Sequence, residues 1–288
     1  MKKNICLFLC LLLMSCCKIF SQDIQKYDKD RNYFFIGGGG NWNSFSHSGL
    51  DFVIDRYNDT RQGKPGQFRL TQKMNKINSM IGYNFGLGYV SNKYDNGLFY
   101  TMYFQHGSGS TYAEGYAPTD TLSLNIQRRD LRASLGNFSM GMGFMPIQTA
   151  VMDIGIGGQM NMDFLDVETK TDNTSYKKLT SDLGEIGFGG SFYLLFNFFL
   201  SKSIPLCLSV QPYYFYDFLP SDMSAVNEEI NSATYSADND KDQKGKMSHL
   251  GLQVQLNLCL FARKQEGSQR HNQDNKKKKR QTHGFSML

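Results

Sequence analysis

Residues 77–90 read INSMIGYNFGLGYV, and this stretch decides the fold. Large apolar side chains stand at nearly every second position, and asparagine, methionine or glycine stands between them. A period of two is typical of a β-strand that presents two unlike faces. The apolar face of this stretch consists of Ile77, Ile81, Tyr83, Phe85, Leu87 and Tyr89.

Seven further segments repeat the alternation, three of them less regularly. Residues 37–40 are consecutive glycines that lack the context of a phosphate loop and indicate close strand packing or a bend. The segment around Leu135–Gly136 changes phase, which indicates either a bulge or a strand end that rises above a membrane. The eight expected strands are residues 33–42, 77–90, 98–106, 130–145, 151–164, 185–199, 206–217 and 249–260.

The lengths of the strands and connections select a barrel in a membrane. Soluble sheets use strands of about five or six residues, whereas tilted membrane strands need about nine to eleven. Short and long connections also alternate, as in an up-and-down outer-membrane barrel. We therefore predict an all-β fold, a closed antiparallel up-and-down transmembrane β-barrel of eight strands. The short connections are 91–97, 146–148 and 200–205, and the long ones are 43–76, 107–129, 165–184 and 218–246.

Composition excludes several other classes of protein. The chain has 288 residues, 40% of them hydrophobic, and a mean hydropathy of −0.42, which excludes a bundle of membrane-spanning helices. Aromatic residues make up 14%, too many for a disordered chain. The net charge of +5 arises from +3 in residues 1–18 and +6 in residues 262–288, so the body between them carries −4. This acidic body offers no nucleic-acid-binding face.

The chain begins with the pattern of an export signal. Lys2 and Lys3 precede a short apolar run that is followed by small and polar residues. We expect cleavage after Ser21; cleavage after Gln22 and lipidation at Cys16 stay open as alternatives. The predicted organisation is a signal peptide at 1–21, a periplasmic segment at 22–32, the barrel at 33–261 and a basic disordered periplasmic tail at 262–288.

The predicted architecture resembles the eight-stranded outer-membrane barrel families: the OmpA-like transmembrane domain, OmpX and the PorT-like barrels. The resemblance covers residues 33–261 and rests on the architecture and on a last strand that ends in Phe261. It implies the bacterial outer membrane, and an even number of strands places both termini in the periplasm. Two features depart from these families: a polar tail follows Phe261, and no peptidoglycan-binding domain follows the barrel, so an anchoring role is not carried over.

Several polar residues are expected to face the lumen. They support two interpretations, a hydrated polar network or an ion path, and a filled eight-stranded barrel disfavours the ion path. The candidates are Asp153, Asp163, Glu185, Gln211, Asp217, His249 and Gln253.

Cys207 and Cys259 are expected on the inward faces of adjacent antiparallel strands, near the periplasmic end. Pairing Asp217 with Met247 gives an index sum of 464, and the cysteines sum to 466, so they are expected nearly opposite one another. Two states stay open here, a disulfide or two small buried thiols, because export makes oxidation possible.

One fragment suggests enzyme chemistry. His106 and Ser108 are expected to point outward together, a spacing similar to that of the outer-membrane lipid A deacylases, in which a histidine activates a serine. No third member accompanies them, so an ordinary start to the connection 107–129 is favoured. We assign no catalytic, cofactor-binding or metal-binding residue and expect no cofactor.

The predicted function is non-enzymatic: a structural, adhesive or secretion-associated role through the long loops and the basic tail. Residues 50–56 are expected to form a small local element in the first long loop. A small-solute porin is the alternative, and a lipid A-modifying enzyme comes third. The expected partners are outer-membrane lipid or lipopolysaccharide and an envelope protein or cell-wall polymer, with no nucleic acid.

Overall fold

The computed structural model describes nine stretches of the chain: residues 32–62, 69–91, 97–117, 125–149, 151–172, 174–182, 184–200, 205–232 and 243–261. The predicted signal peptide at 1–21, nearly all of the segment 22–32 and the basic tail at 262–288 lie outside these residues.

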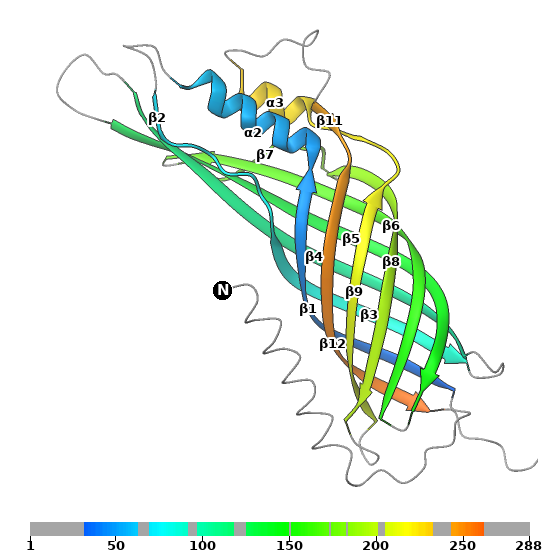
Figure 1. Cartoon of the computed structure of the whole chain (residues 1–288). Coiled ribbons are helices and arrows are strands. Elements are labelled where there is room, and N and C mark those ends of the chain that lie inside the picture. The colour runs from blue at the N-terminus through cyan, green and yellow to red at the C-terminus, as the bar shows by residue number, and fades with distance from the viewer. Residues whose placement is uncertain are drawn as a thin grey trace, which may run out of the picture.

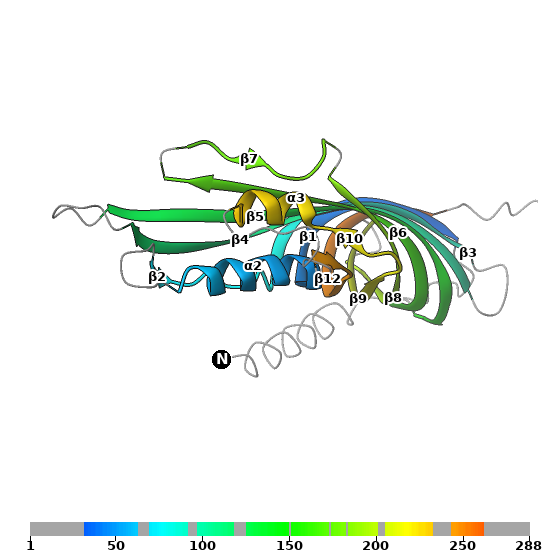
Figure 2. The ribbon, with the colours of Figure 1, turned by 90° about the horizontal axis from the view of Figure 1, so that it is seen from above.

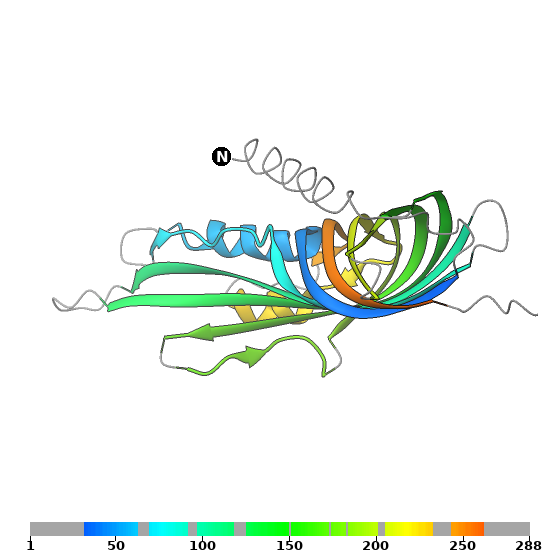
Figure 3. The same ribbon diagram turned by 90° about the horizontal axis from the view of Figure 1, so that it is seen from below.

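Eight long antiparallel strands close into a barrel (Figure 1). Around the ring, the pairing order is β1, β3, β4, β5, β6, β8, β9 and β12, and β12 pairs with β1 along its whole length (Figure 3). This confirms the predicted fold. The strands are β1 (Tyr33–His47), β3 (Met80–Ser91), β4 (Gly97–Ala117), β5 (Asn125–Gln148), β6 (Met152–Thr171), β8 (Glu185–Phe199), β9 (Leu206–Asp217) and β12 (Met247–Phe261).

The four consecutive glycines lie in β1, where that strand meets β12. A side chain at Gly37 or Gly39 would collide with the β12 backbone at Leu256 or Val254. The glycines therefore permit close packing of the two strands that join the ends of the chain, which was one of the expected reasons for them.

Short elements lie at one end of the barrel, in the long connections. We call this the cap end, and we call the end where β1 begins and β12 finishes the terminal end. Residues 50–56, expected to form a local element, belong to a longer helix, and no described helix is long and apolar enough to cross a membrane. The elements are α2 (Ser48–Thr60), α3 (Ser224–Ile230), β2 (Arg69–Gln72), β7 (Lys177–Lys178), β10 (Ser221–Asp222) and β11 (Lys244–Gly245).

A belt of large apolar side chains surrounds the barrel. Side chains along each strand alternate between the lumen and the outside, and those of the belt are outward and exposed. So much exposed apolar surface is stable only against lipid, so the barrel is transmembrane. The belt includes Trp42, Tyr83, Phe85, Tyr100, Phe104, Met140, Met142, Phe144, Ile156, Met160, Phe188, Phe192, Tyr214, Leu250, Leu256 and Leu260.

Strands continue beyond the belt at the cap end, and this corrects the expected loops. β1 runs to His47, five residues into the predicted loop 43–76, and three other strands, β4, β5 and β6, extend further. Most of the predicted loop 107–129 is strand, because β4 runs to residue 117 and β5 starts at residue 125. The predicted loop 165–184 begins with strand as well, because β6 runs to Thr171. The sequence pattern concealed these extensions because their outward side chains are polar, so the apolar alternation stops where the lipid stops.

The phase change near Leu135 marks this boundary. The pairing of β5 with β4 and β6 continues without interruption through Leu135 and Gly136, and the irregularity of β5 lies instead between Phe144 and Ile147. The continuous pairing excludes a bulge at Leu135–Gly136 and agrees with the other expected explanation, a strand that rises above the membrane. Toward the cap, the inward side chains of β5 change from polar, as at Asn137 and Ser139, to apolar. Its outward side chains change from apolar to polar.

The extensions and the short elements form a cap with its own apolar core. The inner face of the extensions lies beside α2 and α3 (Figures 1 and 2), and the side chains between them are almost completely buried. We use the word cap for α2, α3, β2, β7, β10, β11, the described residues that connect them to the barrel strands, and the parts of β4, β5 and β6 beyond the belt. Its core includes Leu50, Val53, Ile54, Tyr57, Met74, Ile77, Ala113, Leu131, Ala133, Leu135, Leu165, Val167, Leu179, Val226 and Ile230.

His47 joins the barrel to the cap. It is the last residue of β1 and the N-cap of α2, and its Nδ1 accepts a hydrogen bond from the Leu50 backbone N–H at 3.1 Å. The side chain is fully buried, and this burial lowers the pKa of His47 to about 4. A neutral imidazole is needed here because a protonated Nδ1 is unable to accept the helix N–H.

We predict that the attachment of α2 weakens as the pH falls from about 6.5 to about 4. In this window the imidazole of the unfolded segment binds a proton that the folded one does not, so up to about 3 kcal/mol of local stability is lost, and none is lost above pH 6.5. Hydrogen exchange of the α2 amides at pH 7 and pH 4.5, corrected for intrinsic rates, measures the change.

The control for this experiment is His47→Asn, because asparagine is a strong N-cap that does not titrate. The variant is expected to keep α2 protected at both pH values. Equal loss of protection in the variant and the wild type would assign the effect to another group.

Candidate functional site

Hydrogen bonds cross the lumen between opposite strands of the barrel. The Tyr33 hydroxyl on β1 donates to Asp153 Oδ2 on β6 at 2.8 Å, and these strands stand four places apart in the ring of eight. The Tyr213 hydroxyl on β9 donates to Gln105 Oε1 on β4 at 2.9 Å, which joins another opposite pair. The hydroxyls of Tyr193 and Thr101 are 2.8 Å apart at a level between these two. Side chains thus block the lumen at successive levels.

Completely or almost completely buried aromatic rings also point into the barrel. Each of these rings is at most 2% exposed. An eight-stranded barrel has room for side chains and little else. The inward rings are Tyr33, Phe35, Phe99, Tyr103, Tyr193, Tyr213 and Phe215.

The polar residues expected in the lumen occupy inward positions but form no single site. Asp153 lies at the terminal end with Tyr33, whereas Asp163 accepts a hydrogen bond from Asn137 Nδ2 nearer the cap. No group of three potential metal ligands occurs among the described residues. Six of these residues are at most 3% exposed, namely Asp153, Asp163, Gln211, Asp217, His249 and Gln253, and Glu185 is partly exposed at the start of β8.

The two cysteines meet inside the barrel. The register of β9 and β12 has an index sum of 464, as predicted, so Cys207 stands opposite Asn257 and Cys259 lies one inward position further along. Both side chains are completely buried, and their sulfur atoms are 2.8 Å apart. The structure holds them as two thiols.

His106 and Ser108 point outward from β4, at the level where the apolar belt ends. They lie within the strand and not at the start of a loop, which corrects the expected boundary. The imidazole of His106 faces the ring of Tyr83, with centroids 5.4 Å apart. Within the described part of the chain, no hydrogen bond joins His106 to Ser108 and none joins His106 to a carboxylate. The arrangement therefore lacks the orientation that an activated serine needs.

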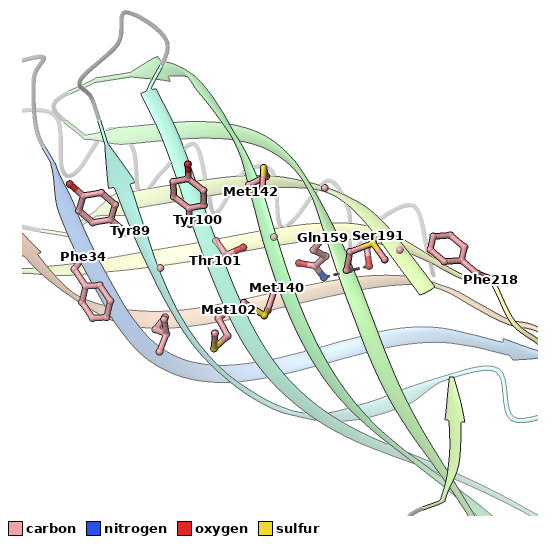
Figure 4. A pocket seen from close by; sticks show the side chains of 16 residues that line it. Phe34, Tyr89, Tyr100, Thr101, Met102, Met140, Met142, Gln159, Ser191 and Phe218 are labelled. Atoms are coloured by element: carbon pink, nitrogen blue, oxygen red, sulfur yellow. Dashed lines mark hydrogen bonds between the residues drawn. The ribbon is translucent and has the colours of Figure 1, made fainter. Parts of the chain in front are cut away.

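A groove crosses the lipid-facing wall of the barrel (Figure 4). Its floor is the backbone of five directly paired residues, and its walls are outward side chains, many of them methionines, which adapt easily to irregular apolar partners. The groove has a volume of about 700 Å³ and lies within the apolar belt. The floor residues are Gly88, Thr101, Gly141, Gln159 and Ser191, and the walls include Tyr89, Tyr100, Met102, Met140, Met142 and Met160.

A polar cavity of about 520 Å³ opens in the cap, at residues that were not predicted as a site from the sequence. It lies between the C-terminal end of α2, the first residues of β5 and the last residues of β6. The only signal in the sequence was the pair Arg128–Arg129 within an expected loop. The lining residues are Tyr57, Arg61, Gln127, Arg128, Arg129, Thr171 and Asp172.

Comparison with known proteins supplies similarity of fold only. No family model matches the chain, and no curated protein matches it in sequence. The outer-membrane protein OprG of Pseudomonas aeruginosa is similar in structure, with a TM-score of 0.36, 11% identity and coverage of 83% of this chain and 100% of that one. Ail, the attachment invasion locus protein of Yersinia pestis, solved with the heparin analogue sucrose octasulfate, gives a TM-score of 0.34, 10% identity and coverage of 79% and 98%.

We predict that the mature protein contains a Cys207–Cys259 disulfide when it is purified from an oxidising compartment. Two thiols lose two protons and two electrons to the disulfide of a thiol oxidant, which becomes a dithiol, and the sulfurs are already in contact. Thiol counting on mature protein denatured without reductant is expected to find none in the wild type. Two titratable thiols at this point would contradict the prediction.

Proposed function

We propose that this chain is a non-enzymatic outer-membrane barrel of a bacterium that conducts no solutes and acts through its cap. The observation that carries the proposal is the pair of hydrogen bonds between opposite strands, Tyr33 to Asp153 and Tyr213 to Gln105. An open pore needs a continuous aqueous path, and side chains that meet across the lumen interrupt it. A small-solute porin is therefore disfavoured.

The proposed orientation places the cap outside the cell and both termini in the periplasm. The described ends of β1 and β12 lie together at the terminal end, where the connections 92–96, 149–151 and 200–205 are short. Short turns on the periplasmic side and long connections on the outer side are the rule for outer-membrane barrels. This supports a cap that faces partners outside the cell.

The cap is an ordered structure and not a set of flexible surface loops, and this favours an adhesive or recognition role. Its helices pack on a continuous sheet, and Lys177 of β7 and Glu229 of α3 tie two connections together at 2.8 Å. This exposed ion pair adds little stability by itself, so the apolar core does most of the ordering. A surface that is ordered before binding loses less entropy when a partner arrives. Lipopolysaccharide, envelope proteins and cell-wall polymers remain the proposed partners, the last two also for the tail at 262–288.

We predict that the refolded wild-type protein is silent in a planar lipid bilayer. The triple variant Tyr33→Ala, Tyr193→Ala and Tyr213→Ala is expected to show discrete openings, because it removes the rings and the cross-lumen hydrogen bonds together. Single-channel recording of protein that migrates as a folded, heat-modifiable barrel makes the measurement.

The matched control for the lumen experiment replaces outward tyrosines. Tyr83, Tyr214 and Tyr216 are 57%, 52% and 43% exposed on the lipid side, so the alanine variant at all three is expected to stay silent. Stable, discrete openings of the wild type would overturn the proposed function and favour a porin.

A further inference from the structure

We propose that the cavity in the cap binds a tetrahedral oxyanion, a phosphate or sulfate ester group, presented by a molecule outside the membrane. The inference rests on the proposed function, in which the cap is the working surface, and it names the chemistry of the ligand. The residues that carry it are Arg61 and Arg129, with Thr171 and Gln127 beside them.

The two guanidinium groups are held next to each other by shared neighbours. Arg61 Nη2 donates to the Ile230 carbonyl at 2.9 Å, and Arg129 Nη1 donates to the same oxygen at 3.2 Å. The centre of the Arg61 guanidinium lies 3.9 Å from the centroid of the Tyr57 ring, and that of Arg129 lies 5.9 Å from it. One carbonyl and one ring thus place two cations at one point of the cavity wall.

Neither of these two cations forms an ion pair with a carboxylate that the structure describes. Within the described residues, no carboxylate lies within 4.0 Å of the side-chain nitrogens of Arg61 or Arg129. Arg128 differs, because its guanidinium pairs with Asp130 at 2.7 Å and with Glu114 at 3.8 Å.

Other groups offset only part of the positive charge. The C-terminal ends of α2 and α3 supply a partial negative charge of about half a unit each. Asp172 also lines the cavity, and its Oδ2 accepts a hydrogen bond from the Arg128 backbone N–H at 2.7 Å. Burial lowers the pKa of Arg61, and the neighbouring Arg129 adds to this effect, which indicates unfavourable repulsion between the pair. An anion in the cavity relieves that repulsion.

Arg129 has hydrogen-bonding capacity to offer a ligand. Its guanidinium makes one described side-chain hydrogen bond, to Ile230, out of five possible donors. Guanidinium forks match the oxygens of phosphate and sulfate and bind them through charge-assisted hydrogen bonds. Arg61 is immobilised by the Tyr57 ring and by Asn231 Oδ1 at 3.2 Å, so its charge is in place before a ligand arrives.

The position of the cavity identifies the source of the anion. Phe138 is the last lipid-facing residue of β5 toward the cap, and Arg129 is nine residues beyond it. At about 3.3 Å per residue this corresponds to about 30 Å along the strand, and to about 20 Å of height for a strand tilted by about 45°. Headgroups at the surface of the surrounding bilayer do not reach so far, so the ester group belongs to a soluble or projecting molecule.

The test titrates the refolded full-length mature chain in nanodiscs that contain only zwitterionic lipid. Inorganic phosphate and inorganic sulfate are added at constant ionic strength, with chloride as the reference anion, and binding is followed by calorimetry. Saturable binding of either oxyanion is expected. Arg129→Gln is expected to weaken it about tenfold, the loss of one charge-assisted contact.

The matched control is Arg132→Gln, which removes an exposed arginine from the outer face of the same strand. This variant is expected to bind within about twofold of the wild type, because a nonspecific charge effect is small and is screened by salt. Arg61→Lys keeps the charge of Arg61 but loses the fork that contacts Ile230 and Asn231, so the loss of helix support is read from the melting temperature and the loss of anion contact from oxyanion binding to protein that is still folded at the measuring temperature.

Three outcomes overturn the inference. They are no oxyanion binding above chloride, equal weakening by Arg129→Gln and Arg132→Gln, and binding that occurs only in nanodiscs with phosphorylated glycolipid. The last outcome would assign the anion to the membrane. Failure here leaves a silent, capped barrel intact, whereas a conducting barrel that still binds phosphate would contradict only the proposed function.

Discussion

The whole structure depends on one constraint: in hydrocarbon, every backbone N–H and C=O group needs a partner within the protein. The sheet meets this constraint because β12 returns to β1 over residues 33–47, and β4 and β5 pair over residues 97–117. Closure then forces each strand to present one face to lipid and one to the lumen. Gly37 and Gly39, at the joint between the two ends of the barrel, let these strands approach without collision.

The surroundings of a strand change from lipid to water along its length. The same strand therefore places its apolar side chains outward within the membrane and inward beyond it. In the membrane, β5 turns Phe138 and Met140 outward and Asn137 and Ser139 inward; beyond the membrane it turns Leu131 inward. Polar contacts therefore join opposite strands across the lumen, whereas an apolar core holds the cap together. The cross-lumen tyrosines are the basis for proposing a lumen that does not conduct and a cap that serves as the working surface.

The sequence predicted the membrane part well and the cap poorly, for physical reasons. Lipid demands a strict alternation, so eight strands followed from periodicity, and the β9–β12 register followed from pairing Asp217 with Met247 at the ends of two of them. Above the lipid, polar and small residues such as Ser108 and Ser110 are compatible with a strand or with a loop. The extensions were therefore expected to be loops. Arg61 and Arg129 are brought together by contacts between segments that lie far apart in the sequence. No local sequence pattern therefore predicts that they are neighbours.

The whole architecture requires that β5 cross a solvent boundary near residue 136 without a break. A nitroxide scan of residues 131–145, in a cysteine-free background in bilayers, measures this through collisions with oxygen and with a water-soluble nickel chelate. We expect oxygen access at 138, 140, 142 and 144, nickel access at 132 and 134, and protection at the odd positions between them. Oxygen access at 132 and 134, or nickel access at 140 and 142, would contradict it.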